Sequence, residues 1–337
     1  MRGFEGTPPE VRSILRRRID RLGLKLERSP VERFVRQLQR EVRRKGIHRF
    51  QAVCYLTDEW GCPDRQPIIG IPFYLADPKL ARLEKKMNDL EDARKIMMYL
   101  RHEAGHAFNY AYRLYDSPRW RQLFGPFRRP YREDYRPVPF SRRFVRHLEG
   151  WYAQKHPDED FAETFAVWLT PGSRWRRRYR DWPAMRKLLY VDRIVRRFGP
   201  KDPVVEQGQT DLTVSEMKVT VQEFYRRTAR QNRADVKLAL EGDLADIFHR
   251  PAGTSNGLIP AAEVIQRHRV DLTDKIAYWT GVKREVVRAL VESMRRHCRE
   301  GKLVGVRRRE PAYLVELSAY GTALAMNYLT RGRFVLK

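Results

Sequence analysis

Apolar side chains recur at helical spacing over residues 88–116, the strongest periodic pattern in the chain. The apolar positions lie three or four residues apart, which places them on one face of an α-helix. They are Leu90, Ala93, Met97, Leu100, Ala104, Ala107, Ala111 and Leu114. Asn88 or Asp89 can cap the first turn, and Ser117 and Pro118 follow the last one. The pattern predicts one long helix with a buried face.

A second helix is predicted after His156. Asp158 is the expected cap, further acidic residues occupy the first turn, and a Thr-Pro-Gly sequence at residues 170–172 ends the helix. Glu163 shares a helical face with small apolar residues, so its carboxylate is expected among them. An exposed acidic helix start is the alternative; it accounts well for Asp158 and Glu159 but less well for Glu163.

The region before these helices predicts two short helices and two strands. Residues 8–45 contain the helices, and the second begins at the Ser-Pro-Val-Glu sequence of residues 29–32. Residues 49–57 and 67–75 predict the strands. In the first strand, alternate residues share one face: Phe50, Ala52, Cys54 and Leu56. Such strands form a plain packed sheet or a sheet whose edge pairs with an extended peptide, and the two interpretations are compatible.

From residue 202 onward the pattern becomes helical and carries little chemistry. The predicted elements are helices over residues 213–230, 232–248, 272–279, 284–300 and 318–329, a linker at 250–257, and strands at 303–309 and 313–317. Two helices followed by a hairpin outline a winged helix, which binds nucleic acid. Basic residues of the second helix would serve such binding: Lys283, Arg284, Arg288, Arg295, Arg296 and Arg299. Packing of these helices as a plain bundle is the alternative.

The composition sets limits but gives no function. The chain has 337 residues and a formal net charge of +26 at pH 7. It can therefore bury a full core, and its surface should bind polyanions non-specifically at low salt. No apolar run is long enough to span a membrane, and residues 1–30 lack the apolar segment of a signal peptide. Three cysteines, Cys54, Cys62 and Cys298, lack metal-ligand spacing and fit a reducing cytoplasm.

The predicted 88–116 helix carries His102, Glu103 and His106 within the sequence His-Glu-Ala-Gly-His. Residues i and i+4 of a helix lie on one side, so both imidazoles can bind one Zn²⁺ while Glu103 acts as a general base. Two solvated histidines are the alternative, and the apolar surroundings of the pair argue against it. Gly105 is a poor helix former, and its missing side chain would let another segment or a substrate approach between the histidines.

A catalytic zinc site needs a third protein ligand and an open fourth position. Glu163 is the best candidate for this ligand, and Asp160, one turn earlier, could accept a hydrogen bond from a ligand histidine. A donor is also needed for the oxyanion that develops during hydrolysis. His156 and Tyr152 are favoured because they precede the Glu163 helix, although His156 could equally cap that helix. Other candidates are Tyr179 and Tyr190.

Residues 117–150 form an insertion between the two metal-site helices that is rich in arginine, proline and aromatic residues. Its expected position over the cleft makes it the candidate element for substrate selection. Within it, Arg142, Arg143 and Arg146 are the candidates for substrate binding, and they predict a preference for acidic or C-terminal carboxylate groups. A solvated loop pinned by its aromatic side chains is the alternative.

The metal-site sequences resemble those of the gluzincin metallopeptidases, and more closely those of the bacterial "putative zinc-binding metallopeptidase" family. The resemblance extends from about residue 45 to the C-terminus and rests on residues 56–60, 71–75, 102–114 and 156–169. It implies His102, His106 and Glu163 as zinc ligands and Glu103 as the base. Val167 stands where many gluzincins carry an aspartate, four residues after the ligand glutamate, and the spacing from His106 to Glu163 is long.

These observations predict an α+β, mostly helical protein. The expected parts are an N-terminal helical segment (residues 1–45), a zincin-like metallopeptidase core (46–200) and a helical C-terminal domain (204–337). The expected activity is that of a cytoplasmic zinc peptidase with one Zn²⁺ per chain, in which Glu103 deprotonates the metal-activated water that attacks a peptide bond. Its expected substrate is a peptide or protein, and acidic ones fit the arginine-rich insertion. The alternatives are a nucleic-acid-associated protein and a pseudoenzyme that keeps zinc for structure and works as a binding module.

Overall fold

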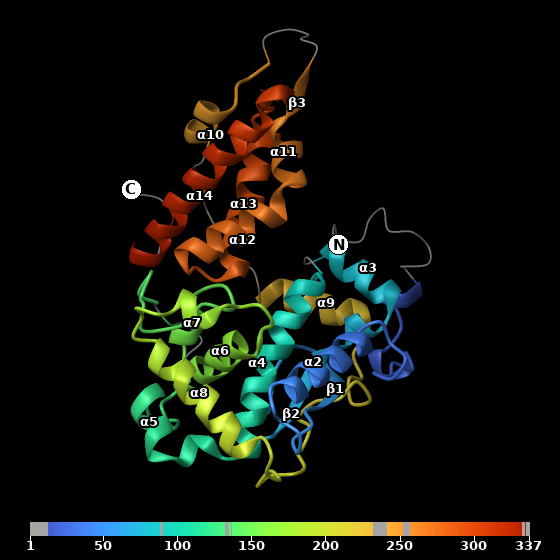
Figure 1. Cartoon of the computed structure of the whole chain (residues 1–337). Helices are drawn as coiled ribbons and strands as arrows, with labels where there is room; N and C mark the ends of the chain where they lie inside the picture. Colours follow the sequence, from blue (N-terminus) through green and yellow to red (C-terminus); the bar gives the residue numbers. More distant parts are fainter. Residues whose placement is uncertain are drawn as a thin grey trace. The chain divides into compact units, whose positions relative to one another are not determined.

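The computed structural model describes residues 13–87, 90–131, 135, 137–231, 241–251, 257–331 and 334 (Figure 1). The chain divides into two compact units. The first holds the described residues of Met1–Tyr135, Phe140–Leu148 and Tyr152–Thr228, and the second those of Arg136–Pro139, Glu149–Trp151 and Ala229–Lys337. The boundary expected near residue 204 therefore lies too early along the chain.

The first unit is mostly helical. Its elements are η1 (Ile19–Arg21), α2 (Glu32–Arg44), β1 (Val53–Thr57), β2 (Ile68–Pro72), η2 (Phe73–Ala76), α3 (Pro78–Met87), α4 (Ala93–Ala111), η3 (Leu114–Asp116), α5 (Pro118–Phe124), η4 (Tyr152–Gln154), α6 (Pro157–Leu169), α7 (Trp175–Arg178), α8 (Met185–Phe198) and α9 (Val221–Gln231). The helix expected over residues 213–230 begins only at Val221. Val221 and Tyr225 of α9 are buried in the same hydrophobic core as α4, which is why this unit continues past residue 204.

The two predicted strands form a small parallel sheet. β1 and β2 pair in register from Val53 opposite Ile68 to Thr57 opposite Pro72. Both strands are shorter than their sequence patterns suggested. Every residue of β2 is buried, whereas β1 begins with the exposed Val53 and becomes buried toward its end. The sheet is therefore a packed part of the core on its β2 side.

Helix α4 covers most of the long helix predicted from sequence but begins later. Asp92 caps it, because its Oδ1 accepts a hydrogen bond from the backbone N of Lys95 at 2.7 Å. The caps expected at Asn88 and Asp89 lie outside the described residues. The α-helix ends at Ala111, and a 3-10 turn follows it.

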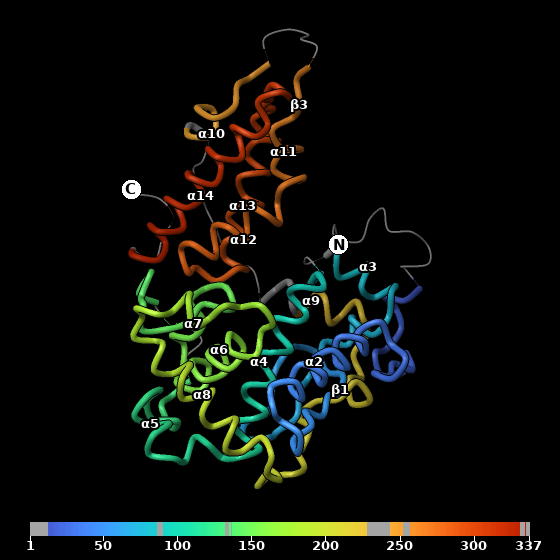
Figure 2. Tube along the Cα trace, in the orientation of Figure 1, coloured from blue at the N-terminus to red at the C-terminus, as the bar shows by residue number. Residues whose placement is uncertain are grey.

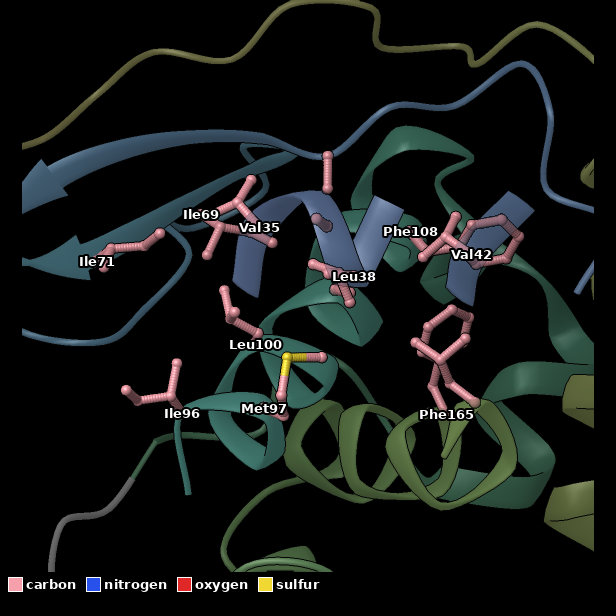
Figure 3. Close-up of a cluster of buried hydrophobic side chains, with 14 of the residues drawn as sticks. Val35, Leu38, Val42, Ile69, Ile71, Ile96, Met97, Leu100, Phe108 and Phe165 are labelled. Atoms are coloured by element: carbon pink, nitrogen blue, oxygen red, sulfur yellow. The ribbon is translucent and has the colours of Figure 1, made fainter. Parts of the chain in front are cut away.

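Helix α4 is covered by α2 and α6 in the core of the first unit (Figure 3). The apolar side chains that meet there come from all three helices and from β2: Val35, Leu38, Val42, Ile69, Ile71, Ile96, Met97, Leu100, Phe108 and Phe165. Phe108 of α4 and Phe165 of α6 stack, with ring centroids 5.3 Å apart. Because α4 is covered in this way, even its polar residues His102, Glu103 and His106 are buried.

The backbones of α4 and α6 approach closely at Gly105. A Cβ atom added to Gly105 would lie 2.8 Å from the Cα of Ala162 and 3.1 Å from the Cβ of Phe165, closer than packed atoms tolerate. The prediction that this glycine lets another segment approach the histidine pair is confirmed, and that segment is α6.

We expect Gly105→Ala to lower the stability of the first unit by about 1–3 kcal/mol, because the new methyl group forces the two helices apart. This loss should exceed the gain of about 1 kcal/mol in helix propensity. Thermal unfolding of the variant against wild type measures it. Gly61→Ala is the matched control, since a Cβ there meets no atom within 4 Å. Equal unfolding midpoints for the two variants would contradict the close approach.

The second unit is a helical bundle with a short antiparallel strand pair. Its elements are α10 (Glu241–Ile247), β3 (Leu258–Pro260), α11 (Ala261–Arg267), α12 (Arg269–Thr280), α13 (Arg284–Glu300), β4 (Val304–Val306), η5 (Arg307–Arg309) and α14 (Glu310–Arg331). Figure 2 shows α12, α13 and α14 lying side by side. The helix expected over residues 284–300 has the predicted bounds. Part of the helix expected over residues 232–248 falls outside the described residues.

The hairpin expected after α13 does not form. β4 pairs with β3, which precedes α11, and the predicted second strand is part of α14. Pro311 lies in the first turn of α14, where a proline fits a helix, and Tyr313 and Leu317 are buried four residues apart. The prediction of a wing after α13 was therefore wrong. No helix within the described ranges is long and apolar enough to cross a membrane.

Candidate metal centre

Two helices bring three potential metal ligands together. α4 supplies His102 and His106, and the first turn of α6 supplies Glu159. The Nε2 atoms of the two histidines lie 3.1 Å apart, and Oε2 of Glu159 lies 2.9 Å from Nε2 of His102 and 3.2 Å from that of His106. All three side chains are buried. The three atoms therefore face one point.

The donor set fits a zinc ion. Nitrogen and oxygen ligands at the usual 2.0–2.1 Å from tetrahedral zinc are separated from each other by about 3.3 Å, close to the spacing of these atoms. The outer nitrogens are held by carboxylates: Nδ1 of His102 lies 2.9 Å from Oε1 of Glu163, and Nδ1 of His106 lies 2.8 Å from Oδ2 of Asp158. When each Nδ1 atom carries the proton and donates it to the carboxylate, the Nε2 lone pair of the same ring is free to bind a metal.

Glu163, the third ligand expected from sequence, does not lie with the three converging atoms. It is fully buried, and its Oε2 accepts hydrogen bonds from the backbone N atoms of His147 and Leu148 at 3.1 and 2.9 Å. Its Oε1 faces the outer nitrogen of His102. Glu159, one turn earlier on α6, stands in the position that the sequence pattern assigned to Glu163.

Asp160 was expected to orient a ligand histidine, and this prediction was wrong. Its Oδ2 accepts a hydrogen bond from Nζ of Lys187 on α8 at 2.5 Å. Burial raises the pKa of Asp160 to about 7, although the neighbouring Lys187 opposes this rise. Asp158 contacts His106 instead, and it also accepts hydrogen bonds from Nδ2 of Asn109 at 2.7 Å and from the hydroxyl of Tyr110 at 2.5 Å.

Glu103 is placed beside the converging atoms and lines the adjoining cavity. Burial raises the pKa of its carboxyl group, and the nearby His102 and His106 act in the opposite direction. Cys62 lines the same cavity, and its Sγ donates to the backbone carbonyl of Glu103 at 3.3 Å. Glu103 is therefore a buried carboxyl group, next in the chain to a candidate ligand, with access to the cavity.

The two favoured candidates for the oxyanion donor, His156 and Tyr152, differ in their contacts. Nδ1 of His156 accepts the backbone N–H of Asp158 and so caps α6, and its Nε2 donates to the carbonyl of Arg129 at 2.8 Å. The ring of Tyr152 lies against that of His102, with centroids 5.5 Å apart. Burial is the main cause that raises the pKa of Tyr152 above its usual range. Both nitrogens of His156 are thus occupied, whereas the half-buried Tyr152 lies beside the site with its hydroxyl 3.4 Å from that of Tyr131.

The sequence of this region matches a family model. Residues 66–171 match the family model described as "Putative zinc-binding metallo-peptidase". The match covers both helices of the site, so it confirms the family resemblance over the part of the chain that carries the candidate ligands. The comparisons with curated proteins and with solved structures gave no match.

A cavity of about 550 Å³ opens beside the three converging atoms within the part that matches the family. Its wall includes Tyr131, whose hydroxyl donates to Oε1 of Glu159. Three arginines also line the cavity, from two segments of the chain: Arg65, Arg128 and Arg129.

The arginines expected to bind substrate lie elsewhere. None of the three is among the residues that line the cavity. The guanidinium groups of Arg142 and Arg146 lie over the ring of Trp182, and the carbonyl of Arg143 accepts a hydrogen bond from Lys187. The chain continues from Arg146 to His147 and Leu148, whose backbone N–H groups donate to the Glu163 carboxylate. Arg128 and Arg129 belong to the 117–150 insertion expected to select substrate, but the sequence did not single them out, and Arg65 lies outside that insertion. No periodic pattern in a loop shows which arginines face a cavity.

Proposed function

We propose that the first unit binds one zinc ion through His102, His106 and Glu159 and hydrolyses a peptide bond. One observation carries this proposal: three donor atoms converge beside a cavity that also holds Glu103. Two imidazoles and one carboxylate are the ligand set of zinc peptidases, and three protein ligands leave a fourth position for the reaction. The match of residues 66–171 to the metallopeptidase family supports it.

The residues around the site have separate tasks in this proposal. A zinc ion held there would supply a Lewis acid that polarises a carbonyl group and lowers the pKa of water. The Glu103 carboxylate accepts the proton from the attacking water and passes it to the leaving amine. Its raised pKa suits this exchange, because a group that titrates nearer the working pH both takes up and releases a proton readily. Asp158 and Glu163 hold the two histidines in the required orientation.

We assign the role of hydrogen-bond donor to the oxyanion to Tyr152. Its ring lies against that of His102, and a tyrosine hydroxyl is protonated at neutral pH, as a hydrogen-bond donor must be. We prefer it to His156, since that imidazole already caps α6 and binds the carbonyl of Arg129.

Tyr152→Phe should lower kcat by about 100- to 1,000-fold, the usual effect of removing one oxyanion donor, with little change in zinc content or KM. Steady-state kinetics on any cleaved peptide measure this. Tyr190→Phe is the matched control, because the Tyr190 hydroxyl lies near Ser117 and does not line the cavity. A full rate in Tyr152→Phe would move the oxyanion role to another group.

The proposal is tested by incubating the full chain with a diverse peptide library and identifying cleaved bonds by mass spectrometry. We expect cleavage that stops after removal of metal by a chelator and returns on addition of about one equivalent of zinc. Zinc bound with no cleavage of any peptide would contradict the peptidase proposal and favour a pseudoenzyme.

A cytoplasmic location is part of the proposal, because all three cysteines are unpaired.

A further inference from the structure

Two arginines of the cavity wall stand on a segment whose backbone is fixed. Arg128 and Arg129 follow Phe127, whose ring stacks on that of Tyr115 with centroids 4.3 Å apart. The carbonyl of Arg129 accepts the hydrogen bond from His156, the cap of α6. The segment is therefore attached to the same helix that supplies the candidate ligand. Both arginine side chains are exposed.

Apart from Glu103, the acidic groups of the cavity wall already have partners. Glu159 binds the two histidines and Tyr131, and Asp158 binds His106, Asn109 and Tyr110. Asp64 lies 3.7 Å from the guanidinium of its neighbour Arg65. Within the ranges that the structure describes, no carboxylate lies within 4.0 Å of the Arg128 or Arg129 guanidinium. These two cations therefore face the cavity without a carboxylate from the described part of the chain.

We propose that Arg128 and Arg129 select substrates that carry a carboxylate close to the scissile bond. This inference rests on the proposed peptidase function and names the substrate class of the same site. A guanidinium group binds a carboxylate through two parallel hydrogen bonds, and the pair is stronger where a cleft wall excludes part of the water. The carboxylate is that of a Glu or Asp side chain or that of a free C-terminus, since both present the same planar group.

A matched peptide series separates these two sources. Each cleaved sequence is made with Glu or its uncharged isostere Gln near the cleavage site, and each is made with a free or an amidated C-terminus. We expect the charged member of at least one pair to be cleaved with a kcat/KM about tenfold higher, the effect of one charge-assisted hydrogen bond. Preference within the Glu/Gln pair indicates a side chain, and preference for the free terminus indicates cleavage near the peptide end.

The double variant Arg128→Gln/Arg129→Gln tests the residues. We expect the charged-to-neutral ratio of kcat/KM to fall to near one in this variant. Arg121→Gln is the matched control, because Arg121 is an exposed arginine of α5 that does not line the cavity, and it should keep the wild-type ratio. A wild-type ratio near one, or an unchanged ratio in the double variant, would overturn the proposal.

A binding measurement keeps this inference separate from hydrolysis. The zinc-loaded Glu103→Gln chain is titrated with fluorescein-labelled charged and neutral peptides, and binding is followed by anisotropy. We expect about tenfold tighter binding of the charged peptide, weakened by salt and lost in the Arg128→Gln/Arg129→Gln background. If wild type cleaves nothing but this difference is present, the peptidase proposal fails and the carboxylate site stands. Equal binding of both peptides would overturn the carboxylate site.

Discussion

Glu159→Gln protein should lose its zinc, whereas Glu163→Gln protein should retain it with weaker affinity. Glu159 places a carboxylate oxygen 2.9 and 3.2 Å from the two histidine nitrogens that face the metal position, so its replacement removes a ligand. Of the two histidines, Glu163 contacts only His102, at its outer nitrogen, and loss of such an orienting carboxylate costs about 10- to 100-fold in metal affinity. We expect the Glu159 variant to lose more than about 100-fold.

Zinc content by mass spectrometry and affinity by chelator competition measure both effects. The two substitutions are matched, since each exchanges a buried carboxylate on α6 for an amide of the same shape. Circular dichroism and thermal unfolding show whether each variant keeps its fold. If Glu163→Gln loses zinc and Glu159→Gln keeps it, the ligand set that the family resemblance implied is correct and the one proposed from the structure is wrong.

Glu103→Gln should keep its zinc and lose its turnover. An amide cannot accept a proton from water, and removal of a general acid–base normally costs about 100- to 10,000-fold in rate. Glu103 does not belong to the cluster of His102, His106 and Glu159, so metal content should remain near that of wild type. KM should change little, because the amide fills the same space. Single-turnover kinetics with a cleaved peptide measure the loss.

Asp116→Asn provides the control for this substitution, because it makes the same chemical change at an exposed carboxylate paired with Arg113. It should have the wild-type rate. Full turnover in Glu103→Gln with zinc present would show that Glu103 is not the base. Loss of zinc in that variant would instead make Glu103 part of the metal site.

The long central helix could be predicted from sequence because its signals agree. The apolar spacing of α4, the His-Glu-Ala-Gly-His sequence and the glycine within it all indicate a buried helix with a metal-binding face. Gly105 was informative because a poor helix former in a regular helix needs a packing reason, and the backbone of Ala162 supplies it.

The third ligand could not be chosen from sequence because α6 has no exposed face. All of its residues are buried, so the contrast between polar and apolar positions that usually sets the phase of a helix is absent. Glu159 and Glu163 also lie four residues apart and therefore on one side of the helix. Asp158 and Glu159 looked like an ordinary acidic first turn. The four-residue spacing of Glu159 and Glu163 equals that of His102 and His106. This spacing is the signal that could have made Glu159 a candidate beside Glu163.

The C-terminal misprediction has a different cause. Residues 303–309 and 313–317 have strand-like composition and are separated by Glu310 and Pro311, a pair typical of a turn. A proline also fits the first turn of a helix, and α14 begins there. β4 then pairs with β3, a strand from before α11 that local sequence could not indicate.

A crystal structure of the zinc-loaded protein, with anomalous data collected on both sides of the zinc absorption edge, tests the central claim most directly. We predict one zinc peak in the first unit, about 2.0–2.2 Å from Nε2 of His102, Nε2 of His106 and a carboxylate oxygen of Glu159. Glu163 should remain on the outer nitrogen of His102. A zinc ion bound by Glu163 in place of Glu159, or no peak between the histidines after reconstitution, would contradict the proposed site.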